Sequence, residues 1–546
     1  MDFNPGKSTA PLRLGFPQGL KPAENPIPSQ LSRESCGFMA MLPQADSTWT
    51  LNEAAHLLNR AGFGGSPEEI KALHAMGRVK AVDSLLNGED SQDTVPRPSW
   101  ATVEQALADF RARNQQRRET MRATRGLSPE EAEKARREAN QQMQQENRRR
   151  SLESQGWWFR RMVHTKAPLR EKMTLFWHDH FATSIQKVKQ PVFMIEQNEL
   201  FRRNAFGSFR DLTQSIVMDP AMLFYLDTQN SRKGKPNENF AREVMELFTL
   251  GEGNYSEQDI REAARAFTGY QLDFISAKVT HNRRQWDETE KTIFGRTGPF
   301  DGKDVVNLIF EKPAVARFMA KKLWEFFVYD NPAQPALDSL ADTLRKADYQ
   351  IAPLLREIFL SREFYSENAI RYQIKCPVQF LVSMLKQLGI AEPPAGFPIN
   401  AQQQLGQILF LPPNVAGWDW GQAWINTNTL LTRYNLAGFL TKGVDESGSM
   451  AGGDRMKLPG MGRIAGNMGR NWQGPDYEKI APRELRDNPE QLVDSLIFRF
   501  FQGPIPDKAR GSFIEYATSK KGAVFTNKET AELCHLMLST PYYQLC

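Results

Sequence analysis

The chain has 546 residues, of which 40% are hydrophobic and 24% are charged. These proportions are ordinary for a globular protein, and the length predicts roughly two to four domains of typical size. The 69 basic and 64 acidic residues leave a net charge of only +5, so we expect no nucleic-acid partner. No stretch approaches the ~20 consecutive apolar residues of a membrane-spanning helix.

The cysteine spacing and the N-terminal composition lead to two further expectations. Cys36, Cys376, Cys534 and Cys546 are far apart and form no CxxC spacing, which predicts buried thiols rather than a disulfide framework or a zinc ribbon. Residues 1–48 are rich in proline and interrupted by charges, and their apolar stretch CGFMAML is too short and too far from the start to be the apolar region of a signal peptide. We expect a disordered lead rather than a signal peptide. A cytoplasmic location is the default, and export by a route not visible in the sequence is the alternative.

A charged insertion interrupts the main helical domain, which we expect to span residues 49–440. Residues 99–153 contain few large apolar side chains and many Arg, Glu and Gln, which are strong helix formers. The segment predicts two charged helices, broken near Gly126-Leu127-Ser128. They form either a surface for an anionic partner or two solvated helices, and both interpretations stay open.

Helix signals are densest between residues 155 and 270. The stretch PLREKMTLFWHDHF has large apolar residues at helical spacing, and the Ala-Thr-Ser that follows it predicts the end of the helix. Asn237 and Gly251 bracket a second helix, and a Ser256/Asp259 capping pair starts a third. The last two predict an αα-hairpin. YQLDFISAKVTH has strand character, so we expect a mainly α, multi-helical fold with at most a small β-hairpin.

The C-terminal half contains an internal repeat. A segment over about 316–366 and another over 479–546 each show two helical patterns joined by a Pro-containing turn, followed by a third helix. Each ends in the pattern Leu-Ser-x-x-(Phe/Tyr)-Tyr, which predicts a duplicated three-helix module. Between the copies, residues 441–478 are rich in Gly and Met and predict a loop. This loop is either a lid or a surface excursion.

Five stretches then occur in one order along the chain: LNRAGFGGSPEEIKAL, PLREKMTLFWHDHFATS, DPAMLFYLDTQNSRKGKPNENFAREVMELFTLGEGNYSEQDIREAARAFTGY, RFMAKKLWEFFV and LFLPPNVAGWDWGQAWINTNTLLTRYN. Together they resemble the bacterial family catalogued as domain of unknown function 1800, from about residue 51 to the C-terminus. The resemblance implies a bacterial, mostly helical protein with no established activity. It also implies export for many members and a neighbouring gene for a sulfatase-like protein.

The chain differs from that family pattern in two places. It shows no signal peptide, and Phe248 stands in MELFTLG where many relatives carry a histidine. If that histidine carries chemistry in the relatives, part of the chemistry is missing here.

The first candidate for chemistry is a divalent-metal site, with His178, His180, Glu243, Glu246 and His281 as ligands. Imidazole and carboxylate are the side chains that borderline and harder divalent metals bind. The two glutamates are three residues apart and share a helical face. The two histidines share a side only if the backbone between them is extended, because on a helix they point about 200° apart.

A structural interpretation explains the same residues without a metal. Arg242 lies four residues from a glutamate on either side, which suits an ion-paired helix face. His180 is placed to cap a helix C-terminus, and Asn237 and Asn239 are placed to bond backbone at a helix start.

Two further interpretations concern Asp179 and the tryptophans. Asp179 lies between the two histidines and is placed to orient an imidazole for acid–base chemistry. Trp418, Trp420 and Trp424 lie within seven residues. They form either a carbohydrate-binding surface or an aromatic plug that closes the core.

Three functions therefore stay open. The first is a metal-dependent enzyme of unknown reaction. The second is a non-catalytic scaffold or accessory partner of a co-encoded, sulfatase-like protein. The third is a carbohydrate-binding protein that uses the tryptophan-rich surface.

Overall fold

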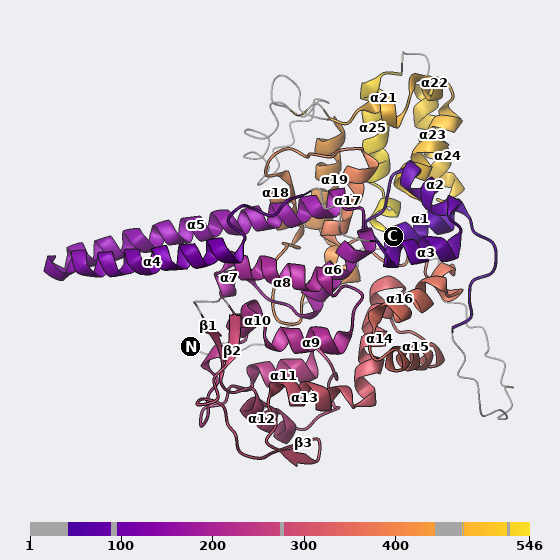
Figure 1. Ribbon diagram of the computed structural model, residues 1–546. Helices are drawn as coiled ribbons and strands as arrows, with labels where there is room; N and C mark the ends of the chain where they lie inside the picture. Colours follow the sequence, from indigo (N-terminus) through magenta and orange to yellow (C-terminus); the bar gives the residue numbers. More distant parts are fainter. Residues whose placement is uncertain (1–41, 89–94, 274–277, 443–471, 473, 521–524) are drawn as a thin grey trace, which may run out of the picture. The chain divides into compact units, whose positions relative to one another are not determined.

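The computed structural model describes residues 42–88, 95–273, 278–442, 472, 474–520 and 525–546 (Figure 1). The predicted proline-rich lead and the predicted Gly/Met-rich loop fall largely outside these residues. The described residues are mainly α-helical, as the sequence predicted. None of their helices is long and apolar enough to cross a membrane.

The N-terminal helices begin at sequence-encoded caps. Thr50 and Ser66 each form a capping box with the glutamate three residues further on, which satisfies backbone N–H groups that the first turn leaves free. The helices of this region are α1 (Leu51–Arg60), α2 (Pro67–Ala75) and α3 (Arg78–Leu86).

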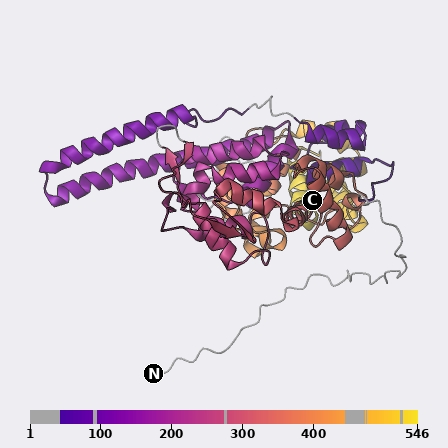
Figure 2. The same ribbon diagram turned by 60° about the horizontal axis from the view of Figure 1, so that its bottom comes forward.

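The charged segment folds as two helices that lie side by side in both views (Figures 1 and 2). They are α4 (Val103–Ala123) and α5 (Pro129–His164), with the 3-10 turn η2 (Thr124–Gly126) between them. Near the base of this pair, Arg150 of α5 forms an ion pair with Asp109 of α4. The last turns of α5 carry the fully buried Trp157 and Trp158 into the core.

The middle of the chain contains α6 (Pro168–His180), α7 (Ile185–Val188), α8 (Pro191–Arg203), α9 (Phe209–Val217), α10 (Pro220–Tyr225), η3 (Thr228–Asn230), α11 (Glu238–Glu246) and α12 (Glu257–Ala266). Helices α11 and α12 form the predicted αα-hairpin. Asn237 caps α11 by accepting the backbone N–H of Asn239, and Ser256 starts α12 with a capping box.

The structure contains two small antiparallel sheets among its described residues, where the sequence predicted at most one. The expected hairpin pairs β1 (Tyr270–Asp273) with β2 (Lys278–His281), and the additional one pairs β3 (Lys291–Ile293) with β4 (Arg296–Gly298). The turn of the second hairpin has positive φ at both central residues, Phe294 (51°) and Gly295 (79°). This is the backbone of a tight hairpin turn that usually carries Asn-Gly. Because Phe-Gly is not a usual pair for this turn, the sequence did not predict the second hairpin.

The C-terminal half repeats one order of elements. The first copy consists of α14 (Pro313–Phe327), α15 (Gln334–Lys346), α16 (Ile351–Leu360) and η4 (Glu363–Tyr365). The second consists of α23 (Pro489–Phe500), α24 (Asp507–Ser519), α25 (Asn527–Leu538) and η6 (Pro541–Gln544). The remaining elements are α13 (Gly302–Phe310), α17 (Pro377–Gln387), α18 (Phe397–Leu405), η5 (Gly421–Trp424), α19 (Thr427–Lys442), α21 (Tyr477–Ile480) and α22 (Arg483–Arg486).

A buried ion cluster holds α5, α6 and α8 together inside the apolar core. The carboxylate of Glu171, which is 1% exposed, lies 2.5 Å from Arg202 Nε and 3.4 Å from Arg161 Nε. The indole of Trp158 donates a further hydrogen bond to it. Burial raises the pKa of Glu171, but the two arginines outweigh burial and hold the pKa below its usual value. These contacts fix α6, whose last turn carries the site described next.

Candidate functional site

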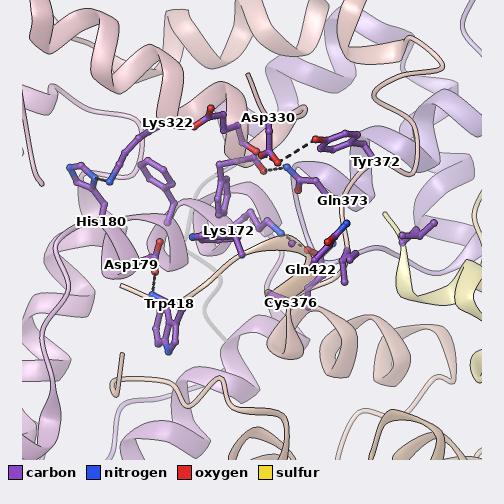
Figure 3. A pocket seen from close by; sticks show the side chains of 18 of the residues that line it. Lys172, Asp179, His180, Lys322, Asp330, Tyr372, Gln373, Cys376, Trp418 and Gln422 are labelled. Carbon is purple, nitrogen blue, oxygen red and sulfur yellow. Dashed lines mark hydrogen bonds between the residues drawn. The ribbon is translucent and has the colours of Figure 1, made fainter. Parts of the chain in front are cut away.

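A cleft of about 870 Å³ opens between four segments of the chain. They are α6 from Lys172 onward, the C-terminal part of α14 with the loop after it, residues 372–379 at the start of α17, and the segment 416–422; Leu545 adds one more side chain to the lining. Figure 3 shows His180, Lys322 and Asp179 grouped at one end of the cleft, and Tyr372, Gln373 and Gln422 toward the other. A concave site with a few polar groups on apolar walls is the usual form of a ligand pocket.

Asp179 is the buried carboxyl of this cleft. Its Oδ1 accepts a hydrogen bond of 2.7 Å from the backbone N–H of Trp418 (Figure 3). Burial raises the pKa of Asp179 to about 7, while the hydrogen bonds from Trp418 and Trp420 and the charge of Lys322 limit the rise. A carboxyl with this pKa can give or take a proton near neutral pH.

Gly417 allows the backbone to pass close to Asp179. A Cβ atom at position 417 would lie 2.4 Å from Asp179 Oδ1, and the φ angle of Gly417 is +94°. Both the contact and the backbone conformation therefore require glycine. This explains the Ala-Gly-Trp sequence: the glycine brings the N–H of Trp418 onto the carboxyl.

His180 and Lys322 form a hydrogen-bonded pair beside Asp179. His180 Nε2 lies 2.9 Å from the carbonyl oxygen of Phe248, so this nitrogen carries the hydrogen. Nδ1 is then free to accept from Lys322 Nζ at 3.3 Å. Burial lowers the pKa of both groups, and Asp179 opposes the shift at Lys322. The imidazole is therefore neutral and positions the lysine.

Two aromatic rings stand at the mouth of the cleft. Trp420 is 44% exposed and Tyr372 is 45% exposed. The edge-to-face contact of Trp420 with Phe326, at 5.1 Å between ring centroids, holds the indole in place. The Tyr372 hydroxyl donates to Asp330 at 3.2 Å. Both rings are thus held from one side while a large part of each stays exposed.

The three predicted tryptophans have different roles. Trp418 and Trp424 are buried, at 4% and 6% exposure, whereas Trp420 is exposed. Trp418 and Trp424 therefore fit the predicted aromatic plug. The predicted carbohydrate-binding surface remains an interpretation for Trp420 alone.

The structure separates His178 from His180. Both lie in α6, so they point to different sides of a helix that ends only after His180. His178 is fully buried between the rings of Trp158, Phe410 and Trp418, at 5.0, 5.2 and 5.9 Å. Its burial lowers the pKa to about 3, and neither ring nitrogen has a hydrogen-bond partner within the described parts of the chain.

The two predicted glutamate ligands have different surroundings. Glu246 accepts a 2.7 Å hydrogen bond from the hydroxyl of Tyr255. Burial and the charge of Glu246 raise the pKa of Glu243. Arg242 turns toward Glu257, at 2.8 Å, and toward Glu238, at 3.5 Å. The ion pair with Glu238 agrees with the structural interpretation, but the second partner of Arg242 is Glu257 of α12 rather than Glu246.

His281 lies in β2 and belongs to a different environment again. Its ring stacks on Tyr270 at 4.5 Å, and its Nε2 lies 3.2 Å from the carbonyl oxygen of Thr268. Across the ranges that the structure describes, no three His, Cys, Asp or Glu side chains are grouped so that they could hold a metal ion. The five predicted metal ligands thus do not meet as one site, and Asn237 serves as a helix cap whose side chain accepts the backbone N–H of Asn239.

Phe248, which replaces the histidine of many relatives, is next to His180. Its fully buried ring lies 6.0 Å from the imidazole and 5.2 Å from Phe181. The position therefore adjoins the candidate site, but here it supplies only an apolar wall and the carbonyl that fixes the His180 tautomer.

Sequence reasoning missed most of the cleft. Lys322 is one of two lysines in an amphipathic helix, and Lys172, whose Nζ donates to Gln379 at 2.6 Å, resembles an ordinary helix residue. Tyr372 and Gln373 belong to no motif. Only Asp179, His180 and the tryptophans had a local signal, because they are adjacent in the sequence to unusual clusters.

Comparison with known proteins identifies the family. A family model described as "Protein of unknown function (DUF1800)" matches residues 56–545, nearly the whole chain. No curated protein and no solved structure matches the chain. The match extends over all four segments of the cleft, and the chain belongs to the DUF1800 family.

Proposed function

We propose that this protein binds a carbohydrate or a similar hydroxyl-rich ligand in the cleft. The observation that carries the proposal is Trp420, an indole held by Phe326 at the cleft mouth and 44% exposed. An exposed, immobilised indole presents a large apolar face to a sugar ring and loses little conformational entropy on binding.

The polar groups of the cleft suit such a ligand. Amide side chains (Gln373 and Gln422) line it together with the hydroxyl of Tyr372. Hydroxyl groups of a sugar donate and accept hydrogen bonds, as these side chains do. A few polar groups beside an aromatic wall fix the orientation of a ligand.

The charges of the lining favour a neutral ligand. Two lysines, Lys172 and Lys322, and three carboxyl residues, Asp179, Glu325 and Asp330, line the same cleft. Neither sign dominates, so the cleft does not attract an anion or a cation as a whole.

The proposal is tested by binding to soluble polysaccharides. Native affinity electrophoresis in gels containing hydroxyethyl cellulose, xylan, soluble starch or glycol chitin gives a dissociation constant for each. Trp420→Ala is expected to weaken binding at least 10-fold, about 1.4 kcal/mol. Tyr434→Ala is the matched control, because Tyr434 is 42% exposed and does not line the cleft. Failure of the wild type to bind any probe, or unchanged binding by Trp420→Ala, would contradict the proposal.

The scaffold function has one observation in its favour. Met121, Leu127 and Met143 of the α4–α5 pair are 55%, 44% and 44% exposed, although the surrounding side chains are charged or polar. The scaffold function uses these three side chains as contacts for a protein partner, here the co-encoded sulfatase-like protein. We expect the partner to co-purify with the wild-type protein and to be lost when the three residues are replaced by serine. Equal recovery of the partner with the wild type and the triple variant would contradict the scaffold function.

The metal-dependent enzyme has no support from the placement of its ligands. It has a direct test: elemental analysis of the purified protein and of His178→Ala and Glu243→Ala. Stoichiometric metal in the wild type that is absent from both variants would establish a metal site, even though the structure places the predicted ligands apart.

A further inference from the structure

We propose that Asp179 is the general acid of a hydrolase that cleaves the glycosidic bond of the carbohydrate bound in the cleft. This inference rests on the proposed function and adds a reaction to it. The residues that carry it are a buried carboxyl at one end of the cleft and two more accessible carboxylates that line the same cavity, Glu325 and Asp330.

The surroundings of Asp179 keep a proton on it. The carboxyl accepts hydrogen bonds from the backbone N–H of Trp418 and from the side chain of Trp420, which favour its charged form, but no cation lies within ion-pairing distance of it among the residues described. The titratable groups that act on it are Lys322 from α14, which favours the charged form, and Asp419 from the neighbouring loop, which opposes it. His180 on the same helix is neutral. Burial dominates and raises the pKa of Asp179 to about 7.

The other carboxylates have a different environment. Asp330 is exposed and accepts the hydroxyl of Tyr372. Glu325 is half-buried and accepts the backbone N–H of Asn331 at 3.3 Å. A protonated carboxyl on an apolar wall and a second carboxylate in a polar, partly solvated setting are the pair that glycoside hydrolysis uses.

The reaction consumes one water molecule and no other reactant. Asp179 donates its proton to the glycosidic oxygen as the bond from that oxygen to the anomeric carbon breaks. The oxygen of water forms the new bond to the anomeric carbon, and the proton of that water passes to Asp330 or Glu325. Return of this proton to Asp179 through solvent restores the site.

A second buried carboxyl provides a matched control. The pKa of Asp219 is also raised to about 7 by burial. Its side chain caps α10 at Met222 and accepts from Gln197 at 2.7 Å, and it does not line the cleft. A general effect of removing a buried carboxyl would therefore appear in Asp219→Asn as well.

The experiment measures binding and turnover separately. The probes are the four polysaccharides named above, with dissociation constants from affinity electrophoresis and turnover from newly formed reducing ends. Asp179→Asn keeps the acceptor for Trp418, so we expect binding within 2-fold of wild type and turnover reduced at least 100-fold. Asp219→Asn is expected to keep wild-type binding and wild-type turnover. The wild-type rate is expected to fall as the pH rises above about 7, where Asp179 loses its proton.

An independent readout follows the proton itself. The infrared C=O stretch of a protonated carboxyl is expected in the wild-type minus Asp179→Asn difference spectrum at pH 5 and is expected to disappear around pH 7. Binding without turnover, an unchanged rate in Asp179→Asn, or a titration midpoint below pH 5 each overturns the inference and leaves the binding function standing. Absence of any binding overturns both.

Discussion

Asp179→Asn also changes how the stability of the protein depends on pH. The pKa of Asp179 rises from 3.8 to about 7 on folding. Because the folded value is the higher one, the folded state keeps a proton that the unfolded state releases between pH ~4 and pH ~7, and stability falls as the pH rises through this range. At ~1.4 kcal/mol per pKa unit the total loss is about 4 kcal/mol, of which about 3 kcal/mol falls between pH 5 and pH 8.

Asparagine cannot ionise, so the substituted protein escapes this loss. An unfolding entropy of roughly 1 kcal/mol per kelvin for a chain of this size converts 3 kcal/mol into about 3 °C. Differential scanning calorimetry at pH 5 and pH 8 is the assay. The Tm of Asp179→Asn relative to wild type is expected to be about 3 °C higher at pH 8 than at pH 5.

The same pair of Tm measurements on Asp219→Asn provides a comparison with a second buried carboxyl. Burial raises the pKa of Asp219 to a similar value, so its effect on Tm is expected to have the same sign and pH range. A Tm difference for Asp179→Asn that is equal at pH 5 and pH 8 would refute the reasoning, because it would mean that the carboxyl is already ionised at pH 5 in the folded protein.

Three further predictions follow from single features. Gly417→Ala is expected to lose polysaccharide binding in the affinity gel, because its Cβ would meet Asp179; Gly295→Ala, with positive φ but open space around it, is expected to bind normally, and equal behaviour would contradict the steric argument. Glu171→Gln is expected to lower Tm by roughly 3–5 °C at pH 7, since breaking a buried ion pair costs about 3–5 kcal/mol. The folded pKa of Glu171 is lowered, so its contribution is lost as the pH falls and the Tm gap is expected to narrow in acid; a constant gap would contradict it. Replacing residues 112–140 by a short Gly/Ser link is expected to leave Tm within about 1 °C, because nearly all described side chains there are at least partly exposed; a large drop would show that the α4–α5 pair supports the core.

The local structure of this protein could be predicted because its signals are local. Capping residues at Asn237 and Ser256 start helices where the sequence predicted them, since a cap depends on hydrogen bonds within three residues. The second β-hairpin was missed because its turn uses Phe294-Gly295 instead of the usual pair.

The predicted metal site could not be decided from local sequence signals. His-x-His suggested two convergent ligands, and the result depended on where α6 stops. The helix continues through His180, so one imidazole enters an aromatic cage and the other contacts Lys322. A helix end depends partly on the packing around it, which a local pattern does not contain.

By itself, the sequence determined the helical class, the repeated three-helix order and the family resemblance, because periodicity and capping depend on near neighbours. Only the tertiary structure decided the candidate site. The hydrogen bond from Trp418 to Asp179 joins residues 239 positions apart, and Lys322 reaches His180 across 142 positions. Burial raises the pKa of Asp179, and burial is a property of the packed core rather than of the residues beside Asp179 in the chain.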